Sequence, residues 1–363
     1  MSLCEASLQG NYDAVKELLD NGADINAQHL GQTPLLLATS HGHESVVKLL
    51  LEKDGIDVNA KDNDGRTPLS RAAEKGNERV VKLLLEKDDV DLNFMDTKGR
   101  TPLTWAAWGG HDSVVKALIA TDGIDPDPKN MPFEPGPLSR AAENGHEAVV
   151  KLLLATNRVN PDSASTRYNR TPLSFAAENG HAGVVELLLE KDSIDVNAKD
   201  KKGWTPLSWA AEKGNERVIK LLLEKDGIDV NEKDNYSRTP LLWAAEKGYE
   251  TVIKLLLEKD GIDINEKDNY SRTPLSWAAE EGNERVIKLL LEKDGIDINA
   301  KDNFGRTPLS WAARKGNERA IKLLLEKDGI DVNKKDNYSQ TPLSWAAMKG
   351  NEGVIKLLLE KDG

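Results

Sequence analysis

The chain has 363 residues, 30% of them charged, with a formal net charge of -12. Basic and acidic residues are interspersed, which argues against nucleic acid or an anionic membrane as the main partner, because both require a clustered basic surface. Cys4 is the single cysteine, so an internal disulfide and a thiolate metal cluster are excluded, and a reducing compartment, the cytosol or the nucleus, is expected. No apolar run is long enough to suggest a membrane span.

The chain opens with a polar unit. Two short helices are expected between residues 3 and 20. The polar side chains of this segment are Gln9, Asn11, Asp13, Glu17 and Asp20. A terminal unit of a stacked array needs a polar outer face, because that face meets water. Residues 1–30 are therefore predicted to form an N-terminal capping unit.

The tripeptide Thr-Pro-Leu then recurs with a period of 34 residues, which lengthens by one residue in the two intervals that lead to Gly136 and to Thr171. The copies open at Thr33, Thr67, Thr101, Gly136 (in place of threonine), Thr171, Thr205, Thr239, Thr273, Thr307 and Thr341. A fixed period of this size is typical of a solenoid whose helical units pack only on their neighbours. We predict an all-α solenoid of about eleven units, and a single array over residues 1–363.

The segment 197–230 illustrates one repeat. Thr205 is a good N-cap and proline follows at the first helical position, so a short helix is expected from Pro206 to about Lys213. Asn215 is expected to cap a second helix, whose apolar residues recur at helical spacing. Gly227 is expected to close that helix.

These residues resemble ankyrin repeats: a turn, Thr-Pro-Leu-x-x-Ala-Ala, a glycine, a Val-Ile-x-Leu-Leu-Leu helix and Asp-Val-Asn. The resemblance covers the whole chain. It implies units of two antiparallel helices with a hairpin finger, stacked into an array that binds a protein partner through the finger tips and the concave face of the first helices. The frequent tryptophans, and serine in place of the family's usual histidine after Thr-Pro-Leu, are similar to ankyrin arrays of filamentous fungi, including those of NLR-type receptors.

The units between residues 94 and 175 diverge from the pattern, whereas residues 197–363 form regular units. We group the preceding unit, which opens at Thr67, with them as the divergent part. Four residues after the opening Thr or Gly, where most units carry tryptophan, this part has Arg71, Trp105, Arg140 and Phe175. Three residues further on it has Glu74, Trp108, Glu143 and Glu178. Positions i and i+3 share a helix face, so these eight residues are predicted to form one strip across neighbouring first helices.

Arginine and aromatic residues dominate binding hot spots, so we predict that this strip binds the partner, together with the loop residues Phe133 and Tyr168. Drift in exposed loops is the alternative interpretation. The tryptophan row of the regular units is expected to be structural, because large aromatics bury well between stacked units.

A second candidate partner surface is a row of finger aromatics spaced by one period. Its members are Tyr236, Tyr270, Phe304 and Tyr338. They are expected at exposed tips, where tyrosine is a good contact residue. Near-identical fingers are also what recent duplication of repeats would leave.

The last unit keeps an apolar helix with no polar replacement at Val354, Ile355 or Leu358. An internal unit would bury that face against its neighbour. We therefore expect weak end-to-end self-association at this unit, or fraying of its helix.

Catalytic signals are few. His41 and His43 form a weak metal pair with no further ligand cluster, and no phosphate-binding loop or nucleophile elbow is present, so no catalytic residue, metal or cofactor is predicted. The leading hypothesis is a non-enzymatic, cytoplasmic or nuclear protein-binding scaffold. The alternatives are a small-molecule or catalytic groove in the divergent units, in which His111 and Asp112 beside Trp108 are the candidates for acid–base chemistry, and the sensor array of an NLR-type immune assembly.

Overall fold

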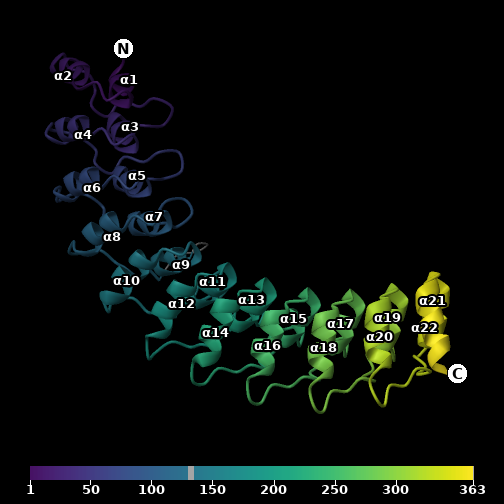
Figure 1. The fold of residues 1–363 in the computed structure, drawn as a ribbon. Coiled ribbons are helices and arrows are strands. Elements are labelled where there is room, and N and C mark those ends of the chain that lie inside the picture. Colours follow the sequence, from purple (N-terminus) through teal and green to yellow (C-terminus); the bar gives the residue numbers. More distant parts are fainter. Residues whose placement is uncertain (130–134, 363) are drawn as a thin grey trace. The chain divides into compact units, whose positions relative to one another are not determined.

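The computed structural model describes residues 1–129 and 135–362, and these residues contain twenty-two helices in sequential pairs (Figure 1). The first helices of the pairs are α1 (Leu3–Leu8), α3 (Pro34–Ser40), α5 (Pro68–Glu74), α7 (Pro102–Gly109), α9 (Pro137–Glu143), α11 (Pro172–Asn179), α13 (Pro206–Lys213), α15 (Pro240–Lys247), α17 (Pro274–Glu281), α19 (Pro308–Lys315) and α21 (Pro342–Lys349).

Each first helix is followed by an adjacent second helix. These are α2 (Tyr12–Asp20), α4 (Glu44–Leu51), α6 (Glu78–Leu85), α8 (Asp112–Ile119), α10 (Glu147–Ala155), α12 (Ala182–Leu189), α14 (Glu216–Glu224), α16 (Glu250–Leu257), α18 (Glu284–Leu291), α20 (Glu318–Leu325) and α22 (Glu352–Asp362). The eleven pairs in the described part of the chain confirm the predicted all-α array.

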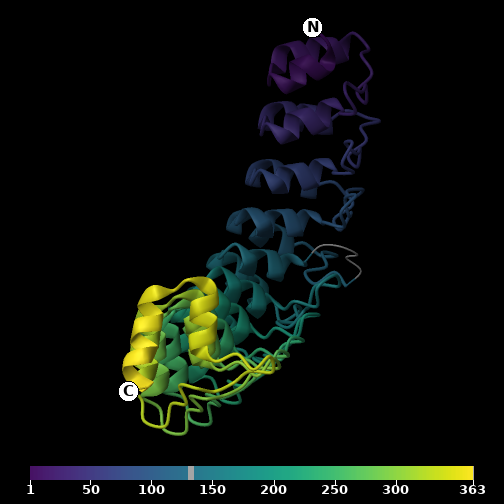
Figure 2. The same ribbon diagram turned by 90° about the vertical axis from the view of Figure 1, so that its right-hand side faces the viewer.

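The chain divides into two compact units, one formed by residues 1–176 and 183–194 and the other by residues 177–182 and 195–363. In each of them, consecutive first helices pack on one another and consecutive second helices do the same, as α5 on α7 and α18 on α20 show. In the N-terminal compact unit the connecting loops lie together on one side of the helices (Figure 2). None of the described helices is long and apolar enough to cross a membrane.

The first helix of the repeat at residues 197–230 begins and ends as the sequence predicted. In α13 the Thr205 hydroxyl accepts a hydrogen bond from the Ser208 backbone N–H at 3.1 Å, and Pro206 occupies the first turn. The helix stops at Gly214, whose φ of 74° is a left-handed value that glycine adopts without strain. Ala210 and Ala211 are fully buried where the helices approach one another.

The second helix of this repeat begins at the predicted place, but without a side-chain cap. Asn215 is the N-cap residue of α14, and its side-chain amide donates to the backbone carbonyls of Ala177 and Glu178, at 2.8 and 2.9 Å, instead of bonding to the first turn of its own helix. These carbonyls lie near the end of the preceding first helix, where acceptors lack helical partners. His111 fills the same role with Nε2 3.0 Å from the Glu74 carbonyl oxygen, so this position joins neighbouring repeats.

The predicted end of the second helix was also wrong. α14 ends at Glu224, three residues before Gly227. Gly227 has a φ of 79° and lies in the turn that follows the helix. The left-handed glycine therefore shapes the connection to the next finger and does not terminate the helix.

The last helix, α22, does not present the residues that the sequence singled out. Val354 is 1% exposed and Leu358 is 3% exposed, so both are buried within the unit, and Ile355 is half-buried. The apolar side chains of this last pair of helices that are well exposed are Leu359 of α22, 54% exposed, and Met348 of α21, 64% exposed. A helix turns by about 100° per residue, so adjacent apolar residues face different ways and sequence alone did not identify the outer ones.

Candidate functional site

The fingers of the regular units are built on a buried aspartate. One carboxylate oxygen of Asp268 accepts the backbone N–H groups of Tyr270 and Arg272, both at 2.9 Å, and the other accepts the Trp277 indole N–H at 3.0 Å. The bond from the indole to the aspartate recurs one period apart. Its other copies are Trp243 to Asp234, Trp311 to Asp302 and Trp345 to Asp336. The tryptophan of the first helix thus fixes the finger that precedes it.

An arginine lies between successive tryptophans in these units. The Arg272 guanidinium carbon is 3.5 Å from the ring centre of Trp277 and 4.2 Å from that of Trp311. Arg238 and Arg306 contact their own pairs of tryptophans in the same way. Arginine stacked on indole gains both cation–π attraction and apolar contact. The tryptophan row therefore holds the regular units together, as the sequence predicted.

The divergent units replace this arrangement with ion pairs at α5. Arg71 stands at the tryptophan position, and its guanidinium contacts the carboxylates of Asp62 at 2.5 Å and Glu74 at 3.3 Å. Arg66 also contacts Asp62, at 3.1 Å, and Glu74, at 3.5 Å. The side chain of Arg71 is only 15% exposed, so most of its surface is used inside the array.

Burial raises the pKa of the Asp62 carboxyl, but the backbone N–H of Arg66 and the charges of Arg71 and Arg66 lower it by more. The net effect holds the pKa of Asp62 below its ordinary value. The carboxylate is therefore stabilised in its charged form by the two arginines.

Two tryptophans stack on one another in α7. The ring centres of Trp105 and Trp108 are 5.3 Å apart and their planes differ by 9°. The guanidinium carbon of Arg100 lies 4.0 Å from the Trp105 ring, and that of Arg140 lies 4.5 Å from the Trp108 ring. Arg140 also pairs with Glu143 at 2.6 Å. Trp105 is buried, whereas Trp108 is half-buried and keeps part of its ring at the surface.

Six of the eight predicted strip residues come together in the structure, and they form what we call the Arg–Trp strip. They are Arg71, Glu74, Trp105, Trp108, Arg140 and Glu143. Arg66 joins the α5 residues of the strip to those of α7, because its guanidinium carbon is 5.7 Å from the Trp105 ring while it also contacts Glu74.

The other predicted residues have the following surroundings. Phe175 is 5% exposed and its ring is 4.3 Å from the guanidinium carbon of Arg170, on the loop before its own helix. Glu178 belongs to the second compact unit, where its carbonyl accepts from Asn215. Tyr168 is 48% exposed. Phe133 lies outside the described residues.

Sequence reasoning missed Arg66, Arg100 and the buried Asp62. The signal was present, because an arginine directly precedes the Thr-Pro-Leu tripeptide in several units and an aspartate stands four residues before that arginine. Aligning the repeats by period, position by position, would have revealed both rows.

The finger aromatics are exposed, as expected. The exposed fractions are 59% for Tyr236, 58% for Tyr270, 40% for Phe304 and 62% for Tyr338. Hydrogen bonds between the tips fix their spacing: the backbone N–H of Asn269 donates to the Tyr236 carbonyl at 3.0 Å, and that of Asn303 donates to the Tyr270 carbonyl at 2.9 Å. The row is thus both accessible and ordered.

The described residues include no group of three side chains suited to hold a metal ion. His41 and His43 stack with ring centres 5.9 Å apart, but each has a backbone contact: Nδ1 of His41 is 2.9 Å from the Leu37 carbonyl oxygen, and Nε2 of His43 is 2.9 Å from that of Leu8. These histidines are oriented by the array itself.

A family model described as ankyrin repeats (3 copies) matches residues 3–96, 55–130, 138–234, 232–302 and 295–363. The chain belongs to the ankyrin repeat family. Ankyrin repeats are in general protein–protein interaction modules, and they are typically non-enzymatic. The resemblance seen in the sequence is confirmed at this level.

Two curated proteins are similar to part of this ankyrin repeat chain. An ankyrin repeat-containing protein of Schizosaccharomyces pombe is 43% identical over 61 residues, which is 16% of this chain and 29% of that protein. A probable serine/threonine-protein kinase of Dictyostelium discoideum is 42% identical over 67 residues, which is 17% of this chain and 8% of that protein. The matches therefore cover less than a third of either relative's length.

Proposed function

We propose that this ankyrin repeat chain is a non-enzymatic scaffold, working in the cytoplasm or nucleus, that binds a protein partner through the Arg–Trp strip. The observation that carries the proposal is the half-buried Trp108, which is stacked on Trp105 and contacted by Arg140 in a row that is mostly charged. In eight other units the corresponding residue is Glu74, Glu143, Glu178, Glu212, Glu246, Glu280, Arg314 or Met348. Trp108 is the single aromatic in that row.

The strip is organised in a way that suits binding. Trp108 and Arg140 already contact each other, and Arg140 is held by Glu143, so little side-chain freedom remains to be lost in a complex. Tryptophan and arginine are also the residue types that contribute most to protein interfaces. A partner would cover the exposed part of the indole and meet the charges of Glu74 and Glu143 beside it.

The finger aromatics and Tyr168 are a secondary contact surface in this proposal. Ordered, exposed tyrosines provide contact area at low entropic cost. We also infer kinship with the tryptophan-rich ankyrin arrays of filamentous fungi from the repeated Trp–Asp and Arg–Trp contacts, and this part of the proposal does not affect the binding site.

Affinity capture with the full chain tests the proposal. The comparison is a chain whose divergent units are replaced by the regular sequence, and a stable partner captured only by the natural chain is expected. With that partner, Trp108→Ala and Arg140→Ala should each weaken binding by about 2 kcal/mol. Trp108→Glu should do the same without disturbing the fold, because neighbouring units carry glutamate at this position.

Lys247→Ala and Lys315→Ala, on first helices of the regular units, are the controls and should have little effect. Equal losses from both sets would refute the location of the site. A thermal shift with a small metabolite, and no captured protein, would favour the alternative of a small-molecule or catalytic groove.

A further inference from the structure

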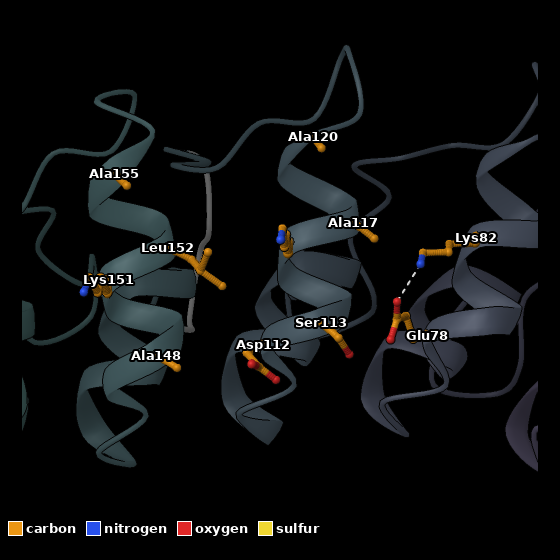
Figure 3. A pocket seen from close by; sticks show the side chains of 11 residues that line it. Glu78, Lys82, Asp112, Ser113, Ala117, Ala120, Ala148, Lys151, Leu152 and Ala155 are labelled. Carbon is orange, nitrogen blue, oxygen red and sulfur yellow. Dashed lines mark hydrogen bonds and ion pairs between the residues drawn. The ribbon is translucent and has the colours of Figure 1, made fainter.

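A groove of about 870 Å³ lies across the second helices α6, α8 and α10 of the N-terminal compact unit. Its floor carries the small or apolar side chains of Ala117, Ala120, Ala148, Leu152 and Ala155. Figure 3 shows Leu152 pointing from α10 towards α8, with Ala148 and Ala155 before and after it along the helix. None of these residues belongs to the Arg–Trp strip, which is formed by first helices.

The groove exists because three positions depart from the repeat. The residue eight positions after the start of the second helix is alanine in α8 and α10, as Ala120 and Ala155, and acidic in all other units. The acids are Asp20, Glu52, Glu86, Glu190, Glu224, Glu258, Glu292, Glu326 and Glu360. Ala117 likewise stands where α6 and α10 have Leu83 and Leu152. With the longer side chains Glu258, Leu289 and Glu292 in their lining, α16 and α18 enclose a hollow of only about 280 Å³, so the shorter side chains leave a larger groove here.

The same changes alter the charge of the surface. Lys116 and Lys151 are exposed, line the groove and have no ion pair among the described residues. Lys82 is paired with Glu78 at 2.6 Å, and Asp112 is the other acid in the lining. Three lysines thus face two carboxylates around an apolar floor, in a chain whose overall charge is strongly negative.

We propose that this groove binds an amphipathic helix of a partner protein, with apolar side chains on one face and carboxylates beside them. Alanines let a helix backbone approach closely, and Leu152 supplies the apolar contact. Lys116 and Lys151 stand at equivalent positions of neighbouring helices and supply cationic partners for the carboxylates. Glu78 and Asp112 make the surface a poor match for an anionic membrane, which favours a clustered basic patch.

Fluorescence anisotropy with labelled helical peptides tests the proposal. One set of peptides, the acidic set, has leucines at positions i, i+3, i+4 and i+7 with glutamates beside them. In the matched set each peptide has lysines in place of those glutamates. The full natural chain is expected to bind the best acidic peptide with a Kd of about 10 to 100 µM and its lysine counterpart at least about tenfold more weakly. Failure of every acidic peptide to bind below about 1 mM, or equal binding of both sets, overturns the proposal.

Variants that restore the repeat's own residues test the location. The double substitution Ala120→Glu with Ala155→Glu should weaken binding of the acidic peptide about tenfold or more, and Ala117→Leu alone should do the same. The helical fold should be kept, since the other units fold with these residues. Glu258→Gln in α16 is the matched control, and Trp108→Glu should leave peptide binding unchanged, which separates this groove from the Arg–Trp strip. Peptide binding that resists all the groove variants would overturn the proposal.

If the groove binds a second copy of the chain or a membrane instead of a partner helix, two further measurements would show it. If sedimentation shows that the chain dimerises and the two glutamate substitutions abolish the dimer, the groove receives a second copy and the partner-helix proposal is overturned. Binding to vesicles of phosphatidylcholine with 30% phosphatidylserine that the same substitutions abolish would overturn it as well.

Discussion

The regular and divergent parts of the array have a buried aspartate at the same position of the repeat, but its carboxylate binds different side chains in the two parts. In the regular units Asp268 receives the Trp277 indole N–H, and the arginines stack between tryptophans. In the divergent units Asp62 instead pairs with Arg66 and Arg71. The backbone of the finger is braced alike in both, since Asp62 and Asp268 each accept two backbone N–H groups within their own finger.

The difference shows which positions of a repeat are free to change. The carboxylate that holds the finger is kept, while the group that meets its second oxygen varies between indole and guanidinium. An exchange of this kind changes the surface chemistry of the first helices without changing the fold. The divergent units gain arginines that are largely buried, Arg71 and Arg140, and an additional tryptophan, Trp108, whose ring is partly exposed. The regular units keep a uniform row.

The largest expected effect is a loss of stability when a charge is placed on the second helix of an internal unit, and the last unit should not show it. Leu325 in α20 is 8% exposed, whereas the equivalent Leu359 in α22 is 54% exposed. Leu325→Glu should lower the free energy of unfolding by several kcal/mol, about 3 to 5, because it buries an unpaired charge. Urea denaturation followed by circular dichroism measures this.

Leu359→Glu is the matched control and should leave the free energy of unfolding nearly unchanged. With Met348→Glu it should also reduce any concentration-dependent light scattering by the natural chain. Equal destabilisation by Leu325→Glu and Leu359→Glu would show that the outer face of α22 is as well covered as an internal one.

Removing the finger aspartate from a regular unit should have the next largest effect. Asp302 accepts the backbone N–H groups of Phe304 and Arg306, both at 2.8 Å, and the Trp311 indole N–H at 3.1 Å. Asp302→Ala leaves these donors unpaired beside the Arg306 guanidinium, so a loss of about 3 kcal/mol is expected in urea denaturation. Asp294→Ala, at an exposed position before the same finger, should cost little. A small effect from both would mean that the indole and the finger are held by packing alone.

The lowered pKa of Asp62, in the divergent part, predicts that the stability of the fold depends on pH. The folded-state pKa of Asp62 is lowered, so the stability that its charge contributes is present above the unfolded-state pKa of about 3.9 and is lost as the pH falls through the folded value. The difference in urea midpoint between the natural chain and Asp62→Asn should therefore be largest near pH 7 and shrink below about pH 4. Asp88→Asn, at an exposed site, serves as control. A difference that stays constant from pH 7 to pH 3 would contradict the ion-pair arrangement.

The smallest effect concerns the serines of the regular fingers. Ser237, Ser271 and Ser339 have φ values of 58°, 59° and 60°, a left-handed conformation, and other fingers carry glycine at this position, as Gly203 and Gly305. Ser339→Gly should stabilise its finger by about 0.5 to 1 kcal/mol by relieving backbone strain, as measured by hydrogen exchange of the finger amides. Ser237→Gly should gain less, because the Ser237 hydroxyl donates to the Asn269 side chain at 2.6 Å. Equal gains from the two changes would show that this hydrogen bond contributes nothing.

Much of the fold could be read from the sequence because its signals are local. The bounds of α13 follow from the chemistry of Thr205, Pro206 and Gly214 within one short segment. The role of Asn215 could not be read in this way, because its amide binds carbonyls of the preceding repeat, 37 and 38 residues away. The same limit applies to Arg66, whose contact with Trp105 depends on how two units stack.

For the candidate site, the spacing of the residues predicted which side chains lie close together, but it did not predict how far they are buried. Trp105 and Phe175 are buried although they were expected to contact the partner, since a first helix that packs on two neighbours leaves only a narrow face open. The groove on α8 and α10 went unnoticed, because alanine is an excellent helix former and gives no local signal. Only its comparison with the acids of the other repeats reveals the gap.

The arginine between two tryptophans also bears on how the array can change length. In the regular part Arg238, Arg272 and Arg306 each contact the tryptophan of their own unit and that of the following unit, as Arg272 does with Trp277 and Trp311. A whole period inserted or deleted among these units joins identical contact partners, and residues 231–264 and 265–298, which differ at only four positions, have the form expected of such a duplication. In the divergent part the equivalent position changes from Arg71 to Trp105 to Arg140. A duplicated copy of α7 would therefore place a second Trp105 beside a unit that now has arginine on its other side. Unequal recombination should therefore lengthen or shorten the regular part freely, while the divergent part keeps its number of repeats.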